Sequence, residues 1–209
     1  ERLPAILPTG LTKTFLATTG SEAIEAAMKT AVLATGKHVF VSYNGAYHGL
    51  SLGALQLGGI PKFREPFAPL IPSAAVHLDY PRNGVDSAEH ALLQLRERIG
   101  FRDDIAAIVI EPIQGRGGCI VPPPGYLAGV RAFCDERNIL LIFDEIYTGF
   151  GRTGSWFAAQ HEDVVPDIIC IGKAMGSGFP ISAAVARDDV MDAWPLSTGE
   201  ALHTSTYLG

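Results

Sequence analysis

The chain has 209 residues, of which 47% are hydrophobic and 18% are charged, a composition typical of one well-packed globular domain. Its net charge of −6 argues against nucleic-acid and anionic-membrane partners. Apolar runs stay well short of the ~20 residues of a membrane span, and we expect no signal peptide. Three cysteines without CxxC spacing predict free thiols in a reducing compartment, hence a cytoplasmic protein. Because the chain lacks an initiator methionine and ends abruptly, we expect it to be part of a longer protein.

Strand and helix patterns alternate along the chain. Apolar runs predict strands at residues 14–17, 39–42, 76–78, 105–110, 140–143, 168–171 and 182–186. Helical patterns cover residues 21–35, 86–99 and 125–137, and Gly36 and Gly100 are placed to end the first two. This alternation predicts an α/β fold with a mostly parallel sheet covered on both faces. Residues 58–72 are predicted to form a surface loop.

Polar residues follow four of the predicted strands. In such folds ligands bind beyond the carboxyl ends of the strands. The segments that follow these predicted strands contain Ser21, Glu111, Asp144 and Lys173. At three of these four places an ionisable group stands at a buried strand end, where a charge is costly unless it is paired. Their concentration on one edge predicts a functional site.

The stretch TTGSEAIEAAMK places Gly20 and Ser21 at the start of a helix. Free backbone N–H groups and the helix dipole favour an anion there, and the Ser21 hydroxyl adds a donor. The alternative interpretation is an ordinary capped helix with Ser21 as its N-cap.

Other kinds of site are disfavoured by the motifs that the chain lacks. A strand ending in Asp-Glu suggests a P-loop ATPase, but no GxxxxGK[ST] loop is present. A GxGxxG pattern occurs at residues 149–154, yet it does not open directly from the strand as a dinucleotide site requires. The six histidines lack metal-ligand spacing, so we expect no metal, and a GxSxG hydrolase motif is absent.

One cofactor makes use of all the remaining groups. Pyridoxal 5'-phosphate (PLP) needs donors for its phosphate, a carboxylate for its pyridine nitrogen, a lysine amine for a Schiff base, and a flat side chain against its ring. Gly20, Ser21, Asp144, Lys173 and Tyr47 can supply these groups. PLP is therefore the predicted cofactor.

Six motifs carry a resemblance to a known family over nearly the whole chain. They are GSEAIEAAMK, AYHG, EPIQGRGG, FDEIYTGFGRTG, IGKAMGSGFP and HTSTY, in family order. Together they resemble the class III (subgroup II) PLP-dependent aminotransferases, the group of the ornithine, acetylornithine and 4-aminobutyrate enzymes. The resemblance implies the large domain of PLP fold type I, a three-layer α/β/α arrangement with a mostly parallel seven-stranded sheet whose last strand, 182–186, runs antiparallel. Residues 1–209 would then form this PLP-binding domain, without the N-terminal segment and the C-terminal small domain.

The resemblance also implies roles for individual residues. Lys173 would form the Schiff base and later carry the proton, and Asp144 would bind the protonated pyridine nitrogen. Tyr47 and Ile146 would pack on the two faces of the ring. The Gly20-Ser21 pair would hold the phosphate.

Further family positions complete the expected site. Thr206 resembles a threonine that reaches the phosphate bound by the neighbouring subunit, which implies a homodimer with shared active sites. Glu111 would support the site without contacting the cofactor, and His48 of the AYHG motif joins the cofactor-binding residues. The small residues after Lys173, such as Gly176, would leave room for cofactor and substrate.

Two positions depart from the family pattern. Position 147 is often glutamine and binds the ring hydroxyl of the cofactor, whereas Tyr147 could reach that group or point away. Position 116 is usually glutamate, which pairs with an arginine of the C-terminal domain that grips the substrate α-carboxylate. Either that domain lacks the arginine, or Arg116 is itself the carboxylate anchor, or Arg116 turns to solvent. We expect the anchor, because a guanidinium binds a carboxylate in bidentate fashion.

The predicted function is a PLP-dependent transamination. An amino group, expected to be terminal, would pass from an amine or ω-amino acid to a 2-oxo acid acceptor. An aminomutase of the same fold is an alternative, although the GFGRTG segment resembles the transaminases. A PLP- or nucleotide-binding domain without turnover is a second alternative. The sequence does not name the amino donor or an oligomeric state beyond the dimer.

Overall fold

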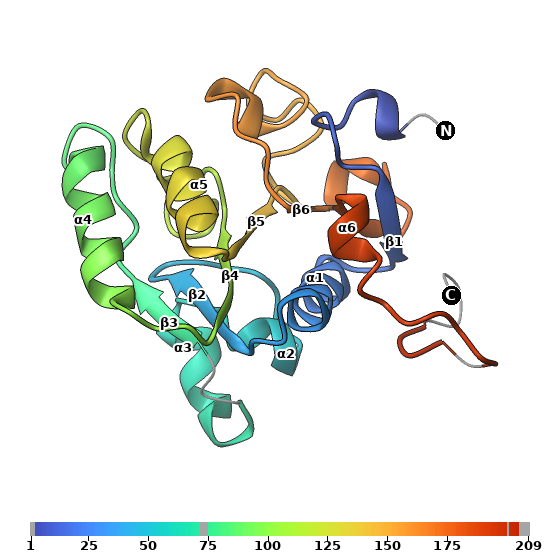
Figure 1. Cartoon of the computed structure of the whole chain (residues 1–209). Helices are drawn as coiled ribbons and strands as arrows, with labels where there is room; N and C mark the ends of the chain where they lie inside the picture. The colour runs from blue at the N-terminus through green and yellow to red at the C-terminus, as the bar shows by residue number, and fades with distance from the viewer. Residues whose placement is uncertain (1–2, 72–74, 200, 205–209) are drawn as a thin grey trace.

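The computed structural model describes residues 3–71, 75–199 and 201–204, and its described part is built around one mixed sheet. Seven strands lie in the order β1-β7-β6-β5-β4-β2-β3 (Figure 1). They are β1 (Lys13–Ala17), β2 (Val39–Tyr43), β3 (Ala75–Leu78), β4 (Ile105–Ile110), β5 (Leu140–Asp144), β6 (Ile168–Ile171) and β7 (Ser182–Ala186). Strand β7 pairs antiparallel with β1 and β6, and the other pairs are parallel. The predicted sheet is confirmed, including its antiparallel last strand.

Three long helices and several short ones connect the strands. The helices are α1 (Gly20–Thr35), α2 (Leu52–Leu55), α3 (Pro61–Arg64), α4 (Ala88–Ile99), α5 (Tyr126–Arg137) and α6 (Asp188–Met191). Short 3₁₀ turns lie at Leu3–Ala5, Glu65–Leu70, Ala158–His161 and Lys173–Met175. The three long helices match the predicted ones to within two residues, whereas α2 and α6, only four residues each, were not predicted. Within the described ranges, no helix is long and apolar enough to cross a bilayer.

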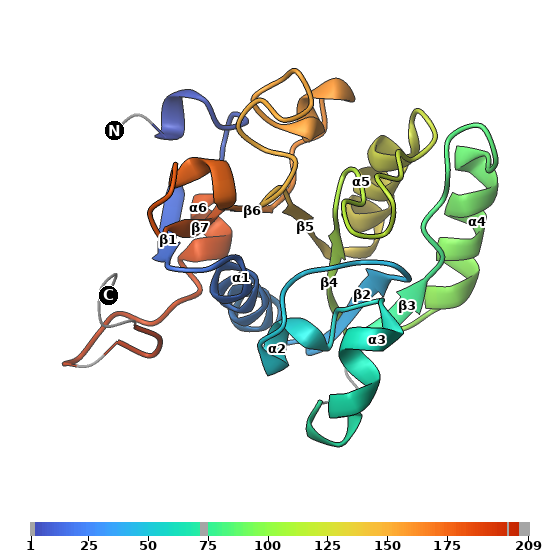
Figure 2. The same ribbon diagram turned by 180° about the vertical axis from the view of Figure 1, so that it is seen from behind.

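The sheet is buried on both faces. On strand β6, Ile168 and Cys170 belong to the apolar cluster that contains α1, while Ile169 and Ile171 belong to the cluster that contains α4 and α5. Successive side chains of a strand point to opposite faces, so an unbroken apolar run fills two cores at once. Figure 2 shows α1 on one side of the sheet and α4 and α5 on the other. These are the three predicted layers.

The expectation of an irregular loop at residues 58–72 is wrong in part. Helix α3 begins at Pro61, and a 3₁₀ turn covers Glu65–Leu70. Proline is well tolerated in the first turn of a helix, because the N–H that it lacks has no helical acceptor there. Prolines that suggested a loop thus begin two short helical turns. Residues 61–62 and 65–70 of this segment are exposed, as expected of a surface segment.

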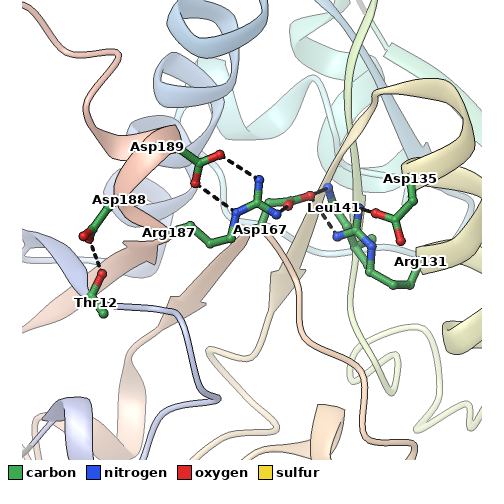
Figure 3. Close-up of polar contacts among 8 residues, drawn as sticks. All are labelled: Thr12, Arg131, Asp135, Leu141, Asp167, Arg187, Asp188 and Asp189. Carbon is green, nitrogen blue, oxygen red and sulfur yellow. Dashed lines mark hydrogen bonds and ion pairs between the residues drawn. The ribbon is translucent and has the colours of Figure 1, made fainter.

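A buried carboxylate ties the sheet together at the edge opposite the carboxyl ends of its parallel strands. Asp167, directly before β6, accepts a hydrogen bond from the backbone N–H of Leu141 on β5 (2.7 Å) and one from Arg131 of α5 (2.8 Å). Arg187, directly after β7, is its third partner (Figure 3). Only 2% of the Asp167 side chain is exposed, so its charge depends on these partners.

Replacing Asp167 by alanine is expected to lower the free energy of unfolding by ~3–5 kcal/mol, because two guanidinium groups lose their buried partner. Asp135→Ala is the matched control, since Asp135 also pairs with Arg131 but is 64% exposed, and it should cost less than ~1 kcal/mol. Urea unfolding of the protein measures both values. Equal losses in the two variants would contradict a special role for Asp167.

Candidate active site

A cavity of about 630 Å³ opens at the carboxyl edge of the sheet. Ten of the predicted site residues line it: Gly20, Ser21, Tyr47, His48, Glu111, Arg116, Asp144, Ile146, Tyr147 and Lys173. The eleventh, Thr206, lies outside the described residues. Six further lining residues were not singled out from the sequence: Thr18, Gly49, Gly115, Phe179, Pro180 and Ile181. The parallel strands and β1 all end at this edge, which explains why segments distant in sequence meet there.

Helix α1 begins at the cavity with free donors. Its N-cap is Thr19, so the alternative interpretation of Ser21 as N-cap is wrong. Thr19 accepts a hydrogen bond from the N–H of Glu22, and the Glu22 carboxylate returns to Thr18, which lowers the pKa of that carboxyl. These bonds form a capping box, in which Thr19 accepts the third N–H group of the helix, that of Glu22. The N–H groups of Gly20 and Ser21 have no acceptor in the described residues. These two amides and the Ser21 hydroxyl can bind an anion.

Two glycines allow the residues around this anion-binding end of α1 to pack closely. A Cβ on Gly49, whose φ is +117°, would lie 2.1 Å from the Ser21 hydroxyl oxygen. A Cβ on Gly20 would lie 2.9 Å from the side chain of Ile146. Both distances are shorter than any ordinary contact, so a larger residue at either position would displace a residue that lines the cavity.

The carboxylate of Asp144 points toward the cavity from the end of β5, the middle strand of the sheet. Only 4% of Asp144 is exposed. One carboxylate oxygen accepts the backbone N–H of Ile146 (3.0 Å), and the other accepts a hydrogen bond from Nδ1 of His48 (2.7 Å). Two donors therefore fix the direction of this buried carboxylate.

His48 is fully buried beside Asp144. Burial by itself would lower its pKa, but the hydrogen bond and negative charge of Asp144 outweigh burial and raise the pKa above the ordinary value. Its Nε2 is buried and has no hydrogen-bond partner in the described residues. The sequence placed His48 in the site only through the AYHG motif, and the structure adds its contact with Asp144.

Glu111 connects two loops instead of facing the centre of the cavity. Its two carboxylate oxygens accept the backbone N–H groups of Tyr47 and Gly115, each at 3.1 Å. Burial raises its pKa, and the nearby charge of Asp144 adds to that rise while His48 opposes it. Glu111 thus holds the loop after β2 and the loop after β4 at a fixed separation.

Glu145 points away from the cavity, although it directly follows Asp144. Its carboxylate accepts hydrogen bonds from Thr148 and from the N–H groups of Ala158 and Ala159. Burial raises its pKa, and these donors oppose the rise. The two neighbouring acids therefore belong to different parts of the molecule: Asp144 to the cavity, and Glu145 to the long connection between β5 and β6.

Lys173 lies at the mouth of the cavity, and the expectation of a buried lysine at a strand end is wrong. Its side chain is exposed, because the extended Gly172 turns the chain off β6 before a 3₁₀ turn begins at Lys173. The φ of Lys173 is +42°, a left-handed conformation that is strained for a residue with a side chain. Its Nζ lies over the ring of Tyr147, 5.5 Å from the centroid. Strain of this kind is found at functional sites.

Gly176, one of the small residues after Lys173, lies where the chain folds back on itself. A Cβ on Gly176 would meet the backbone oxygen of Phe179 at 2.1 Å. The glycine therefore allows the chain to fold back on itself. That fold places Phe179, Pro180 and Ile181 on the wall of the cavity.

Two tyrosines supply flat surfaces. Tyr147 is 41% exposed and packs against Gly115, where a Cβ would meet its ring at 2.8 Å. Tyr47 carries the guanidinium of Arg116 over its ring, with Cζ 4.3 Å from the centroid. Because a guanidinium covers one face of an aromatic ring, Tyr47 has one other face to offer a ligand.

The chain is similar in sequence and structure to known transaminases. The family Aminotransferase class-III matches residues 1–209. The chain belongs to this family. A thermostable (S)-enantioselective omega-transaminase from Thermomicrobium roseum is 33% identical with a TM-score of 0.91, over 99% of this chain and 50% of that one. A transaminase from a marine Virgibacillus is 32% identical with a TM-score of 0.89, over 99% and 48%.

A PLP-bound amine transaminase from an uncultivated Pseudomonas species is 32% identical with a TM-score of 0.87, over 95% of this chain and 49% of that one. The chain thus spans about half the length of the transaminases it matches. PLP is the cofactor of class III aminotransferases. The free amides of α1, the Asp144 carboxylate, the Tyr47 ring and the Lys173 amine fit the groups of this cofactor.

Replacing Gly49 by alanine is expected to weaken PLP binding roughly 10- to 100-fold, because the new methyl group would displace Ser21 and the residue would keep a strained φ. A titration followed by cofactor absorbance measures the dissociation constant. Gly84→Ala is the control, since Gly84 also has a positive φ of 79° but open space around it. Unchanged affinity in Gly49→Ala would rule out a phosphate cradle at Ser21.

Proposed function

We propose that the chain is the PLP-binding large domain of a longer transaminase, which moves an amino group from an amine or amino acid to a 2-oxo acid. The observation that carries this proposal is the meeting of three groups in one cavity. They are the free N-terminal amides of α1, the buried carboxylate of Asp144 and the amine of Lys173. Phosphate, pyridine nitrogen and aldehyde need these three partners.

Four elements of this chain would bind and orient the cofactor. Bound PLP supplies an aldehyde that an amine can capture and a ring that accepts electrons. The Gly20 and Ser21 donors would hold its phosphate at the positive end of α1. Asp144 would pair with the protonated ring nitrogen, and Tyr47 and Ile146 would press on the two faces of the ring.

Lys173 would act twice. Its Nζ would be the amine that holds the cofactor through the aldehyde. When that amine is free, it would move a proton at the substrate carbon as a general base and acid. Its position at the cavity mouth, beside Tyr147, gives the Nζ access both to the interior and to an incoming substrate.

The sequence also supports proposals about assembly and location. The HTSTY motif supports a homodimer, because the threonine at position 206 resembles one that reaches the partner's phosphate in the family. Cytoplasmic location is supported by Cys119, Cys134 and Cys170, which are all free thiols.

The acids at positions 144 and 145 provide the test of the function. In the full-length protein, addition of an amine should convert the absorbance of the PLP form into that of the aminated form, and a 2-oxo acid should reverse it. Asp144→Ala is expected to slow both half-reactions by roughly 100- to 5000-fold, because a buried charge pair worth ~3–5 kcal/mol is broken.

Glu145→Ala is the matched control, one residue away and equally buried. It should lower the melting temperature, because the N–H groups of Ala158 and Ala159 lose their acceptor, while PLP binding and the spectral conversion persist. An active Asp144→Ala protein beside an inactive but folded Glu145→Ala protein would contradict the proposal.

A further inference from the structure

Arg116 carries a positive charge that the described residues leave unpaired. It follows Gly115 in the loop after β4 and lines the cavity. No carboxylate in the described ranges forms an ion pair with it, and among the lining residues of the cavity it is the one arginine that the structure describes.

Two aromatic rings hold its guanidinium in place. Tyr47 and Phe63 lie at 71° to each other with their centroids 5.7 Å apart, and thus form a corner. The Cζ atom of Arg116 lies over both rings, 4.3 Å from the centroid of Tyr47 and 5.6 Å from that of Phe63. Such contacts favour the cation and restrict its side chain.

A stacked guanidinium retains its binding edge. Aromatic contact uses the flat faces of the group, while its N–H donors point outward in the plane and can grip a carboxylate through two parallel bonds. The corner of Tyr47 and Phe63 therefore orients Arg116 without using up the donors that an anion needs. A lysine at this position would supply charge but not this planar fork.

The other cations of the cavity already have roles. Besides Arg116, the described lining residues of the cavity include one other permanent cation, Lys173. The proposed function assigns the Lys173 amine to the cofactor. His48 is bonded to Asp144. The cofactor phosphate has its own donors at α1, so Arg116 remains free for the substrate.

We propose that Arg116 binds the carboxylate of the 2-oxo acid, and that Phe63 is a positioning residue that keeps the guanidinium in the productive orientation. This inference rests on the proposed transaminase function. It selects substrates that carry a carboxylate at the reacting end. It also gives α3 a role, because this short helix carries Phe63, which packs against Tyr47 and Arg116.

The test compares two acceptors of similar shape in the full-length protein. The aminated form is mixed with pyruvate or with 2-butanone, in which an ethyl group replaces the carboxylate, and the cofactor absorbance gives each rate. Arg116→Ala should lower the second-order rate constant for pyruvate roughly 10- to 150-fold more than it lowers that for 2-butanone. Arg116→Lys should recover only part of the loss.

Two further measurements do not depend on turnover. Propionate, an unreactive carboxylate, should bind the PLP form at least ~10-fold more weakly in Arg116→Ala, as judged from the shift of cofactor absorbance. The PLP dissociation constant should stay within about twofold of wild type. A large loss of PLP affinity would instead assign Arg116 to the phosphate and overturn the inference.

Phe63→Leu tests the aromatic corner. It should lower the preference for pyruvate over 2-butanone by about 3- to 10-fold through a higher apparent KM, with an unchanged maximal rate and PLP affinity. Lys62→Ala is the control: Lys62 also lies over the Phe63 ring, at 5.9 Å, but it does not line the cavity. Its acceptor preference should equal that of wild type.

The outcomes separate the two proposals. A wild-type protein that converts no amine or acceptor would refute the transaminase function itself. A wild-type protein that transaminates, together with an Arg116→Ala variant that keeps the full preference for pyruvate, would refute only the role of Arg116.

Discussion

A hydrogen bond of 2.7 Å between His48 and Asp144 holds a buried carboxylate at the end of the middle strand of the sheet. A carboxylate without partners at that depth would cost several kcal/mol, so the position of the histidine is not free to vary. The residues on either side of His48 in the chain are held in place as well. The amide of Tyr47 reaches Glu111 after β4, and Gly49 packs on Ser21 of α1. One buried contact thus sets the relative placement of three walls of the cavity.

Stabilising and functional charges occupy opposite edges of the same sheet. Asp167, at the edge away from the cavity, joins β5, α5 and the end of β7, and its partners leave little of it open to a ligand. At the cavity edge the charges are less fully paired: Nε2 of His48 has no partner in the described residues, and Lys173 is exposed and strained. The sheet can tolerate unpaired polar groups and backbone strain at the cavity edge, because its buried core and the Asp167 contacts at the opposite edge supply its stability.

Much of the fold was predictable because its signals are local. Unbroken apolar runs gave the seven strands, and the glycine after α1 ended that helix in the left-handed conformation that it favours. Residues that the motifs singled out also line one cavity, among them Asp144, whereas the neighbouring Glu145 bonds elsewhere. Short helices such as α3 were missed, since prolines that begin a helical turn look like loop signals in a sequence.

Two local features were missed. Thr19-Gly20-Ser21-Glu22 has the capping-box pattern that makes Thr19 the N-cap, and a backbone turn at Gly172 leaves Lys173 exposed. What could not be predicted depends on contacts between distant segments. The corner that holds Arg116 needs Tyr47 and Phe63 of α3, both between β2 and β3, to meet the loop after β4. No periodic pattern in the sequence predicts such a corner. The sequence did single out position 116, because arginine there departs from the family pattern.

The central claim of this account is that the amine of Lys173 binds the aldehyde of PLP. It is tested most directly by borohydride reduction of the full-length protein loaded with PLP, followed by peptide mapping of the pyridoxyl group. The account predicts that the label is recovered on Lys173. A label on Lys13, Lys29, Lys37 or Lys62, or no label on a protein that has bound PLP, would contradict it.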